Sequence, residues 1–191
     1  MEEICVRCGG RSPRRFCPVL REPICSKCCG KSRNKTIRCV EECQHLAEAR
    51  TQALKRLVNL AGDNRFEVKF FEVLHNLRMT VVKIRARANF NLSEDEVLEA
   101  IDNVLRTQRA LSRGVIYEFR SPNVNTQMVM EGLMLVVRWH KDGEKGLRRL
   151  EPEEITTCLE YLQRQGQVAK EKGVKFLELW ANSVGGKLLG S

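Results

Sequence analysis

The chain has 191 residues, of which 42% are hydrophobic and 30% are charged, and its formal net charge is +9. These values are ordinary for a globular protein, and the length allows one domain or a small module beside a larger one. No run of about 18 apolar residues occurs, and the start MEEICVRC lacks the apolar segment of a signal peptide. We therefore expect neither a membrane span nor secretion, but a cytoplasmic protein.

Cysteine usage is the unusual feature of this sequence. Eight of its nine cysteines lie within the first 43 residues, and Cys158 is the exception. In a reducing compartment, clustered cysteines hold metal more often than they form disulfides. The sequence therefore predicts a metal-binding N-terminus rather than a disulfide framework.

The same N-terminal segment is the basic end of the chain. Residues 1–45 hold ten Lys and Arg against five Asp and Glu, a balance of +5, while the other 146 residues hold 23 against 19, a balance of +4. An excess of positive charge favours association with polyanions, although metal-bound thiolates would offset part of it.

We expect three parts along the chain. Residues 1–45 contain few large apolar groups, so metal sites would have to replace a hydrophobic core there. From residue 46 to 180 the apolar residues recur at helical spacing, which predicts a helical domain. Residues 181–191, rich in glycine, are predicted to be a flexible tail.

The pattern predicts a mainly α protein, in which a small module with two zinc ions, treble-clef-like or cross-brace-like, precedes a five- or six-helix bundle. Ser93 and Glu96 have the spacing of a capping box at the start of one helix, and Pro152 suits the first turn of another. Residues 115–119 are extended or helical, and their periodicity does not decide between the two. The predicted helices cover residues 45–62, 65–90, 93–113, 126–140, 151–173 and 174–180.

The cysteine spacing identifies candidate metal ligands. Two Cys-x-x-Cys pairs, Cys5 with Cys8 and Cys25 with Cys28, are separated by 16 residues, which is typical of a four-cysteine zinc site. Four further cysteines of the segment are enough for a second tetrahedral site, so that adjacent residues 28 and 29 would serve different metals. These four are Cys17, Cys29, Cys39 and Cys43.

Several alternatives remain open at this stage. The pairs could be matched in sequence order, one zinc could leave spare thiols, and His45 could replace any one of the cysteines. Thiolates also bind iron–sulfur clusters. Paired Cys-x-x-Cys turns with following glycines favour zinc, and four protein ligands leave no position for water or substrate, so we expect a structural role.

The strings CVRCGG, ICSKCCGKSR and IRCVEECQHL, followed by VLRTQRALSRGVIYEF, resemble a family of small uncharacterised bacterial proteins. The resemblance spans most of the chain and implies a zinc-finger-like N-terminus with a helical remainder, without a known role. The chain departs from the pattern at Val40, where a proline is expected, and at His45, where an aromatic is expected. More loosely, the module is similar to treble-clef fingers, which mostly bind proteins or nucleic acids.

Nothing in the sequence predicts an enzyme. Glu72 and His75 have the Glu-x-x-His spacing of a di-iron bundle, but the matching second half is missing, since Val137 precedes His140 by three residues. Cys158 lies on an apolar stripe and is predicted to act as a small buried hydrophobe. No phosphate-binding loop, nucleophile elbow or zinc-protease motif is present.

Two kinds of partner follow from the sequence. RNA or DNA would bind basic loops between the metal ligands, with Phe16 as a stacking surface. A protein partner would instead dock on the module and the helical domain, where Met128, Met130 and Met134 offer an adaptable contact, although core packing is their more ordinary use. The predicted phosphate-binding residues are Arg11, Arg14, Arg15, Lys31, Arg33, Lys35 and Arg38.

Overall fold

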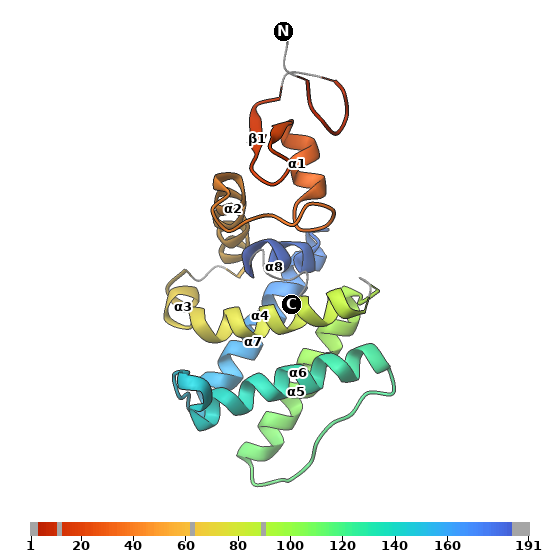
Figure 1. Ribbon diagram of the computed structural model, residues 1–191. Helices are drawn as coiled ribbons and strands as arrows, with labels where there is room; N and C mark the ends of the chain where they lie inside the picture. The colour runs from red at the N-terminus through yellow and green to blue at the C-terminus, as the bar shows by residue number, and fades with distance from the viewer. Residues whose placement is uncertain (1–3, 11–12, 62–63, 89–90, 185–191) are drawn as a thin grey trace. The chain divides into compact units, whose positions relative to one another are not determined.

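The structure, a computed structural model, describes residues 4–10, 13–61, 64–88 and 91–184. These residues form eight α-helices and one two-stranded sheet, so the prediction of a mainly helical protein with a small cysteine-rich N-terminal region is confirmed (Figure 1). The chain divides into two compact units between Gln52 and Ala53. Among the described helices, none is long and apolar enough to cross a membrane.

The N-terminal unit is built from a short hairpin and one small helix, followed by the beginning of a longer helix. The hairpin strands are antiparallel, with Arg15 opposite Ile24 and Cys17 opposite Glu22. The elements are β1 (Arg15–Cys17), β2 (Glu22–Ile24), α1 (Ser26–Ser32) and α2 (Gln44–Ala61), whose second half belongs to the other unit.

The interior of the N-terminal unit contains little hydrocarbon. Its buried hydrophobic residues are Leu46 of α2 and a cluster of three, Cys5, Ile24 and Ile37. The partly buried residues that pack against them are one leucine and five cysteines: Leu20, Cys17, Cys25, Cys28, Cys29 and Cys39. Sulfur therefore takes up much of the space that large aliphatic side chains fill in an ordinary core.

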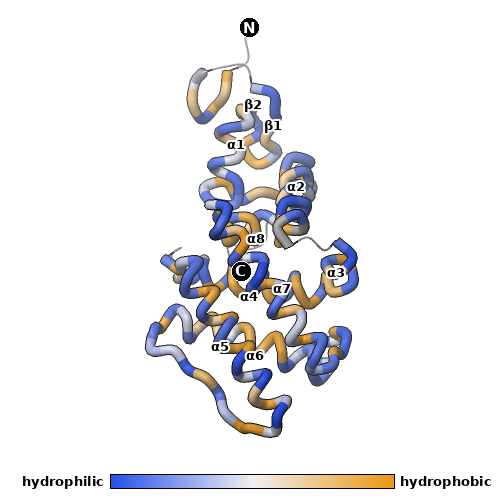
Figure 2. Tube along the Cα trace, turned by 180° about the vertical axis from the view of Figure 1, so that it is seen from behind, coloured by the Kyte–Doolittle hydropathy of each residue, from blue (hydrophilic) through white to orange (hydrophobic). Residues whose placement is uncertain are grey.

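The helical unit has a conventional hydrophobic core. Helix α4 packs against α6 and α8, and α5 packs against α6 and α7. Hydrophobic and hydrophilic residues alternate along these helices, as amphipathic packing requires (Figure 2). The elements are α3 (Asn64–Lys69), α4 (Phe71–Arg87), α5 (Glu94–Ser112), α6 (Val124–Asp142), the 3₁₀ turn η1 (Glu144–Gly146), α7 (Pro152–Glu171) and α8 (Phe176–Val184).

One glycine allows a close approach between two of these helices. A Cβ atom on Gly132 of α6 would lie 2.7 Å from Ile84 Cδ1 and 2.8 Å from Thr80 Cγ2, both on α4. Side chains do not approach so closely, so α6 can lie against α4 at this distance only where the residue has no side chain.

The predicted helix starts are confirmed at two positions. Ser93 accepts a hydrogen bond from the Glu96 backbone N–H, and the Glu96 carboxylate accepts one from the Ser93 N–H at 2.7 Å, which completes the capping box of α5. Pro152 is the first residue of α7, as predicted. Gly62, the predicted end of an earlier helix, and residues 185–191 of the predicted tail lie outside the described residues.

The single helix predicted over residues 65–90 is wrong in one respect: it is two helices, α3 and α4, that meet at Phe70. The reason is an ion pair between Glu67 on α3 and Arg78 on α4. In one straight helix, these residues would be separated by about 16 Å along the axis. The change of direction at Phe70 brings them together, and both are buried.

The same ion pair is part of a buried polar network. The second Arg78 nitrogen lies 2.9 Å from Glu67 and donates a further hydrogen bond to Gln165 Oε1 at 3.1 Å. Gln165 also accepts from Trp180 Nε1 and donates to the Leu57 carbonyl. The network therefore joins α2, α3, α4, α7 and α8 inside the helical unit.

Candidate metal centre

The first pair of predicted ligands lies on a tight turn. The backbone N–H groups of Cys8 and Gly9 both donate to the Cys5 carbonyl, at 3.3 and 2.9 Å. Gly9 has a φ of +64°, a conformation that glycine adopts without strain, so the residue after the pair turns the chain back. The Cys-x-x-Cys turn thus points both thiols to one side.

The second pair is placed by helix α1. Cys25 is the residue that caps the N-terminus of this helix, and its sulfur accepts a hydrogen bond from the Cys28 backbone N–H at 3.4 Å. The Cys25 backbone N–H in turn donates to the Cys5 sulfur at 3.2 Å, which ties the helix to the turn.

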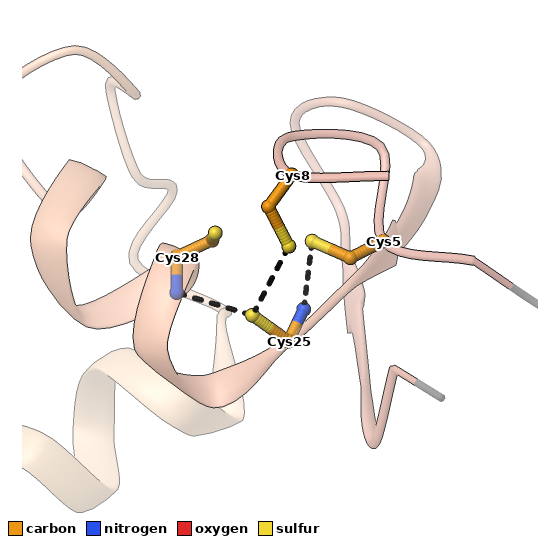
Figure 3. Close-up of side chains that lie close together, drawn as sticks. All are labelled: Cys5, Cys8, Cys25 and Cys28. Atoms are coloured by element: carbon orange, nitrogen blue, oxygen red, sulfur yellow. Dashed lines mark hydrogen bonds between the residues drawn. The ribbon is translucent and has the colours of Figure 1, made fainter. Parts of the chain in front are cut away.

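The four sulfur atoms of Cys5, Cys8, Cys25 and Cys28 all lie within 4.8 Å of one another (Figure 3). The Cys8 and Cys25 sulfurs are 4.0 Å apart. The structure thus brings together the two pairs whose spacing predicted a shared site. Sulfurs grouped in this way can bind one metal ion as four thiolates.

Hydrogen bonds within the cluster shift the pKa values of two of these thiols in opposite directions. The pKa of Cys5 is lowered from 9.0 to about 6, chiefly because the Cys25 backbone N–H donates to its sulfur. The pKa of Cys28 is raised from 9.0 to about 12, chiefly because its thiol is hydrogen-bonded to Cys25, with a further contribution from burial. Four neighbouring thiols cannot all ionise without a cation between them. A divalent metal ion supplies that charge and deprotonates every ligand.

The donor set also limits what the centre can do. Four thiolates suit zinc or an iron–sulfur cluster and do not suit magnesium or calcium, which prefer oxygen. With four protein ligands, a tetrahedral ion has no position left for water or substrate. The centre is therefore suited to holding the fold rather than to catalysis.

The other four cysteines of the unit line a second site, which is a small cavity. Residues 17, 29, 39 and 43 line one small cavity, which His45 also lines. The pKa of Cys39 is raised first by burial and then by its three neighbours, the thiolates of residues 43, 29 and 17. His45 itself is hydrogen-bonded through Nδ1 to Glu48 at 3.2 Å.

The predicted phosphate-binding residues divide into two groups. Arg14, Lys31, Lys35 and Arg38 have exposed side chains. Arg15 and Arg33 are half-buried and donate to the Cys29 sulfur, at 3.6 and 3.8 Å. Arg33 follows Cys29 by four residues, about one helical turn, so this contact is local, whereas the contact of Arg15 with Cys29 joins residues 14 positions apart and could not be predicted from spacing. Arg11 lies outside the described residues.

The residues considered for catalysis have structural contacts. His75 stacks on Phe71, with ring centres 5.7 Å apart. His140 is buried and is held by Asn76 at 3.2 Å and by the Arg148 carbonyl at 3.0 Å. Burial raises the pKa of Cys158 to about 12, so its thiol stays protonated.

Two of the methionines considered for docking contact the neighbouring helix α5. Met130 is buried and accepts from Asn103 through its sulfur, and Met134 accepts from Gln108. Met128 is 37% exposed. Packing within the helical unit thus accounts for Met130 and Met134.

Comparison of the chain with protein-family models, with curated proteins and with solved structures gave no match.

Proposed function

We propose that the chain is a non-enzymatic zinc-binding protein of the cytoplasm, whose N-terminal unit binds nucleic acid. The observation that carries this proposal is the combination of a four-cysteine centre with exposed cations on the segments that it holds in place. A metal-held loop presents guanidinium and ammonium groups to phosphates with little loss of conformational freedom.

Zinc is the metal of this proposal because four thiolates match its preferred ligands and geometry. With eight cysteines in the unit, we propose two zinc ions. A Cys-x-x-Cys turn, then a hairpin, then a helix that begins at the second pair is an order similar to that of treble-clef fingers. A reducing cytoplasm would keep the thiols available for metal.

The proposed nucleic-acid surface consists of Arg14, Lys31, Lys35 and Arg38, together with Phe16, which follows Arg14 by two residues in the sequence. Phe16 is 61% exposed although it is aromatic, so its ring is available for stacking on a base. Because Arg15 and Arg33 donate to Cys29, we assign them to the metal-binding part of the unit instead.

The test is binding of the full chain to fluorescent single-stranded RNA and DNA of random sequence at two salt concentrations. Four phosphate contacts on a single strand would weaken binding about 50-fold between 50 and 200 mM salt. Replacing Arg14, Lys31, Lys35 and Arg38 with glutamine should abolish this binding. A control with the same charge change replaces four exposed cations of the helical unit with glutamine: Lys83, Arg87, Arg113 and Arg120. Equal loss in both variants, or no binding at low salt, would contradict the proposal.

A second candidate function, a protein-interaction adaptor, is favoured by one feature of the helical unit. The connection between α5 and α6 exposes three successive apolar residues, with Val115 at 53%, Ile116 at 96% and Tyr117 at 56%. The segment is held in place from within, since the Phe119 N–H donates to Thr107 and the Arg106 guanidinium lies 4.0 Å from the Phe119 ring centre. A pre-ordered apolar tip of this kind suits a pocket on a protein partner.

This alternative predicts a partner that depends on Ile116 and is nearly insensitive to salt. Ile116→Asp should prevent its capture, whereas Val68→Asp, at a residue of the same unit that is 71% exposed, should not. If Ile116→Asp still captured the protein partner, the segment that contains Ile116 would not be the docking site.

A further inference from the structure

The cavity lined by four cysteines shares helix α1 with the first centre but uses a different cysteine of that helix. Residues 28 and 29 are neighbours on this helix, and successive side chains of an α-helix point about 100° apart. Cys28 belongs to the first sulfur cluster, while Cys29 lines the second cavity. Helix α1 thus carries one cysteine of the first cluster and one cysteine of the second cavity.

The three other cysteines reach the same cavity from two other parts of the chain. Cys17 ends strand β1, and Cys39 and Cys43 lie in the segment just before α2. The cavity measures about 10 Å³, which is close to the space of one water-sized body. Its remaining lining is mostly apolar and includes Ile37 and Leu46, both buried.

A second and independent observation concerns charge. Two guanidinium groups, Arg15 at 3.6 Å and Arg33 at 3.8 Å, converge on the Cys29 sulfur. A neutral thiol is a weak acceptor, whereas a thiolate accepts strongly from a cation. A divalent ion with four thiolates carries a net charge of −2, which two arginines balance. Such donors around a metal ligand orient it and tune the affinity of the site.

We propose that Cys17, Cys29, Cys39 and Cys43 form a second tetrathiolate zinc site, with Arg15 and Arg33 as positioning residues for the Cys29 thiolate. This inference rests on the zinc chemistry proposed for the unit and is independent of nucleic-acid binding. The two sites interleave along the chain, since Cys17 lies between the pairs of the first site. His45 also lines the cavity, with its Nδ1 hydrogen-bonded to Glu48, and the proposed ligand set does not include it because the four thiolates already complete a tetrahedron.

The first test is the number of metal ions per chain. The full-length protein should contain two zinc ions by elemental analysis and should take up two equivalents of Co²⁺ with the absorption of tetrathiolate sites. Cys39→Ser should reduce the content to one, and His45→Ala should leave it at two. One ion per chain in the unmodified protein, or loss with His45→Ala but not with Cys43→Ser, would overturn the ligand set.

Cys39→His keeps the claim testable if Cys39→Ser unfolds the whole unit. Histidine replaces one thiolate by a nitrogen, so two Co²⁺ ions should still bind while half of the spectrum shifts to that of three sulfurs and one nitrogen. An unshifted spectrum would show that Cys39 is no ligand. Iron with the broad absorption of a cluster in place of zinc would also overturn the proposal.

The second test separates the metal role of the arginines from phosphate binding. Arg15→Gln should lower zinc affinity at the second site about 10- to 100-fold in competition with a chelator. Excess zinc should then restore any loss of RNA binding. Arg14→Gln is the matched variant, because it should weaken RNA binding without changing zinc retention. If Arg15→Gln weakened RNA binding and left zinc retention unchanged, Arg15 would be a phosphate ligand and the positioning role would be wrong.

Discussion

The two units of this protein reach a stable fold by different means. The helical unit buries many large apolar side chains, among them Leu74, Leu133 and Trp180, and also contains a buried polar network around Arg78 and Gln165. The N-terminal unit buries two isoleucines, one leucine and one cysteine, and most of the partly buried residues in its cluster are cysteines. Where hydrocarbon is scarce, the proposed metal–thiolate bonds would supply much of the free energy of folding. Cysteines therefore differ between the two units: they are candidate metal ligands in the N-terminal unit, whereas Cys158 is a buried residue of the core in the helical unit.

The largest expected effect comes from changing one cysteine in each unit. Cys25→Ser should abolish metal binding at the first centre and unfold the N-terminal unit, since the free energy of zinc binding is folding free energy there. Cys158→Ser should leave the metal content unchanged and lower only the stability of the helical unit. Elemental analysis with limited proteolysis distinguishes the two. Intact metal content and protease resistance in Cys25→Ser would contradict a structural role for the centre.

The next largest effect is expected when the buried ion pair of the helical unit is broken. Glu67→Gln removes one partner and leaves the Arg78 charge buried, which should cost about 3–5 kcal/mol of unfolding free energy. The double variant Glu67→Gln/Arg78→Met removes both charges and should recover part of that loss. Urea unfolding followed by circular dichroism measures each variant. If Glu67→Gln were as stable as the unmodified chain, the ion pair would not contribute to the free energy of unfolding.

The smallest effect concerns the capping box of α5. Ser93→Ala should cost about 1 kcal/mol of unfolding free energy. The pKa of Glu96 is lowered from 4.5, first by the Ser93 backbone N–H that donates to it. A lowered pKa in the folded state means that the contribution is present above pH 4.5 and is lost as the pH falls below it. Glu96→Gln should therefore reduce the loss of stability between pH 5 and about pH 3, compared with the unmodified chain.

The sequence predicted those features that depend on local spacing. Cys5, Cys8, Cys25 and Cys28 could be grouped because each pair lies on one turn, and the capping box of α5 is a local signal as well. Helical periodicity was sufficient for the mainly α character of the second unit.

Features that depend on distant contacts could not be predicted in this way. The break at Phe70 accompanies the pairing of Glu67 with Arg78, and Arg78 also donates a hydrogen bond to Gln165, 87 residues away. Similarly, Arg15 reads as one more cation of a basic loop until its contact with Cys29 is seen. From the sequence alone, a basic residue near a cysteine cluster could contact either a phosphate group or a cysteine sulfur. Only the folded structure shows that Arg15 contacts Cys29.

The most direct test of the central claim, that metal replaces a hydrophobic core in the N-terminal unit alone, is hydrogen exchange along the full chain before and after treatment with a strong zinc chelator. Chelation should remove amide protection from α1 and the β1–β2 hairpin, while the amides of α4 to α7 should keep their protection. Retained protection in α1 and the hairpin after the metal has been removed would contradict the claim.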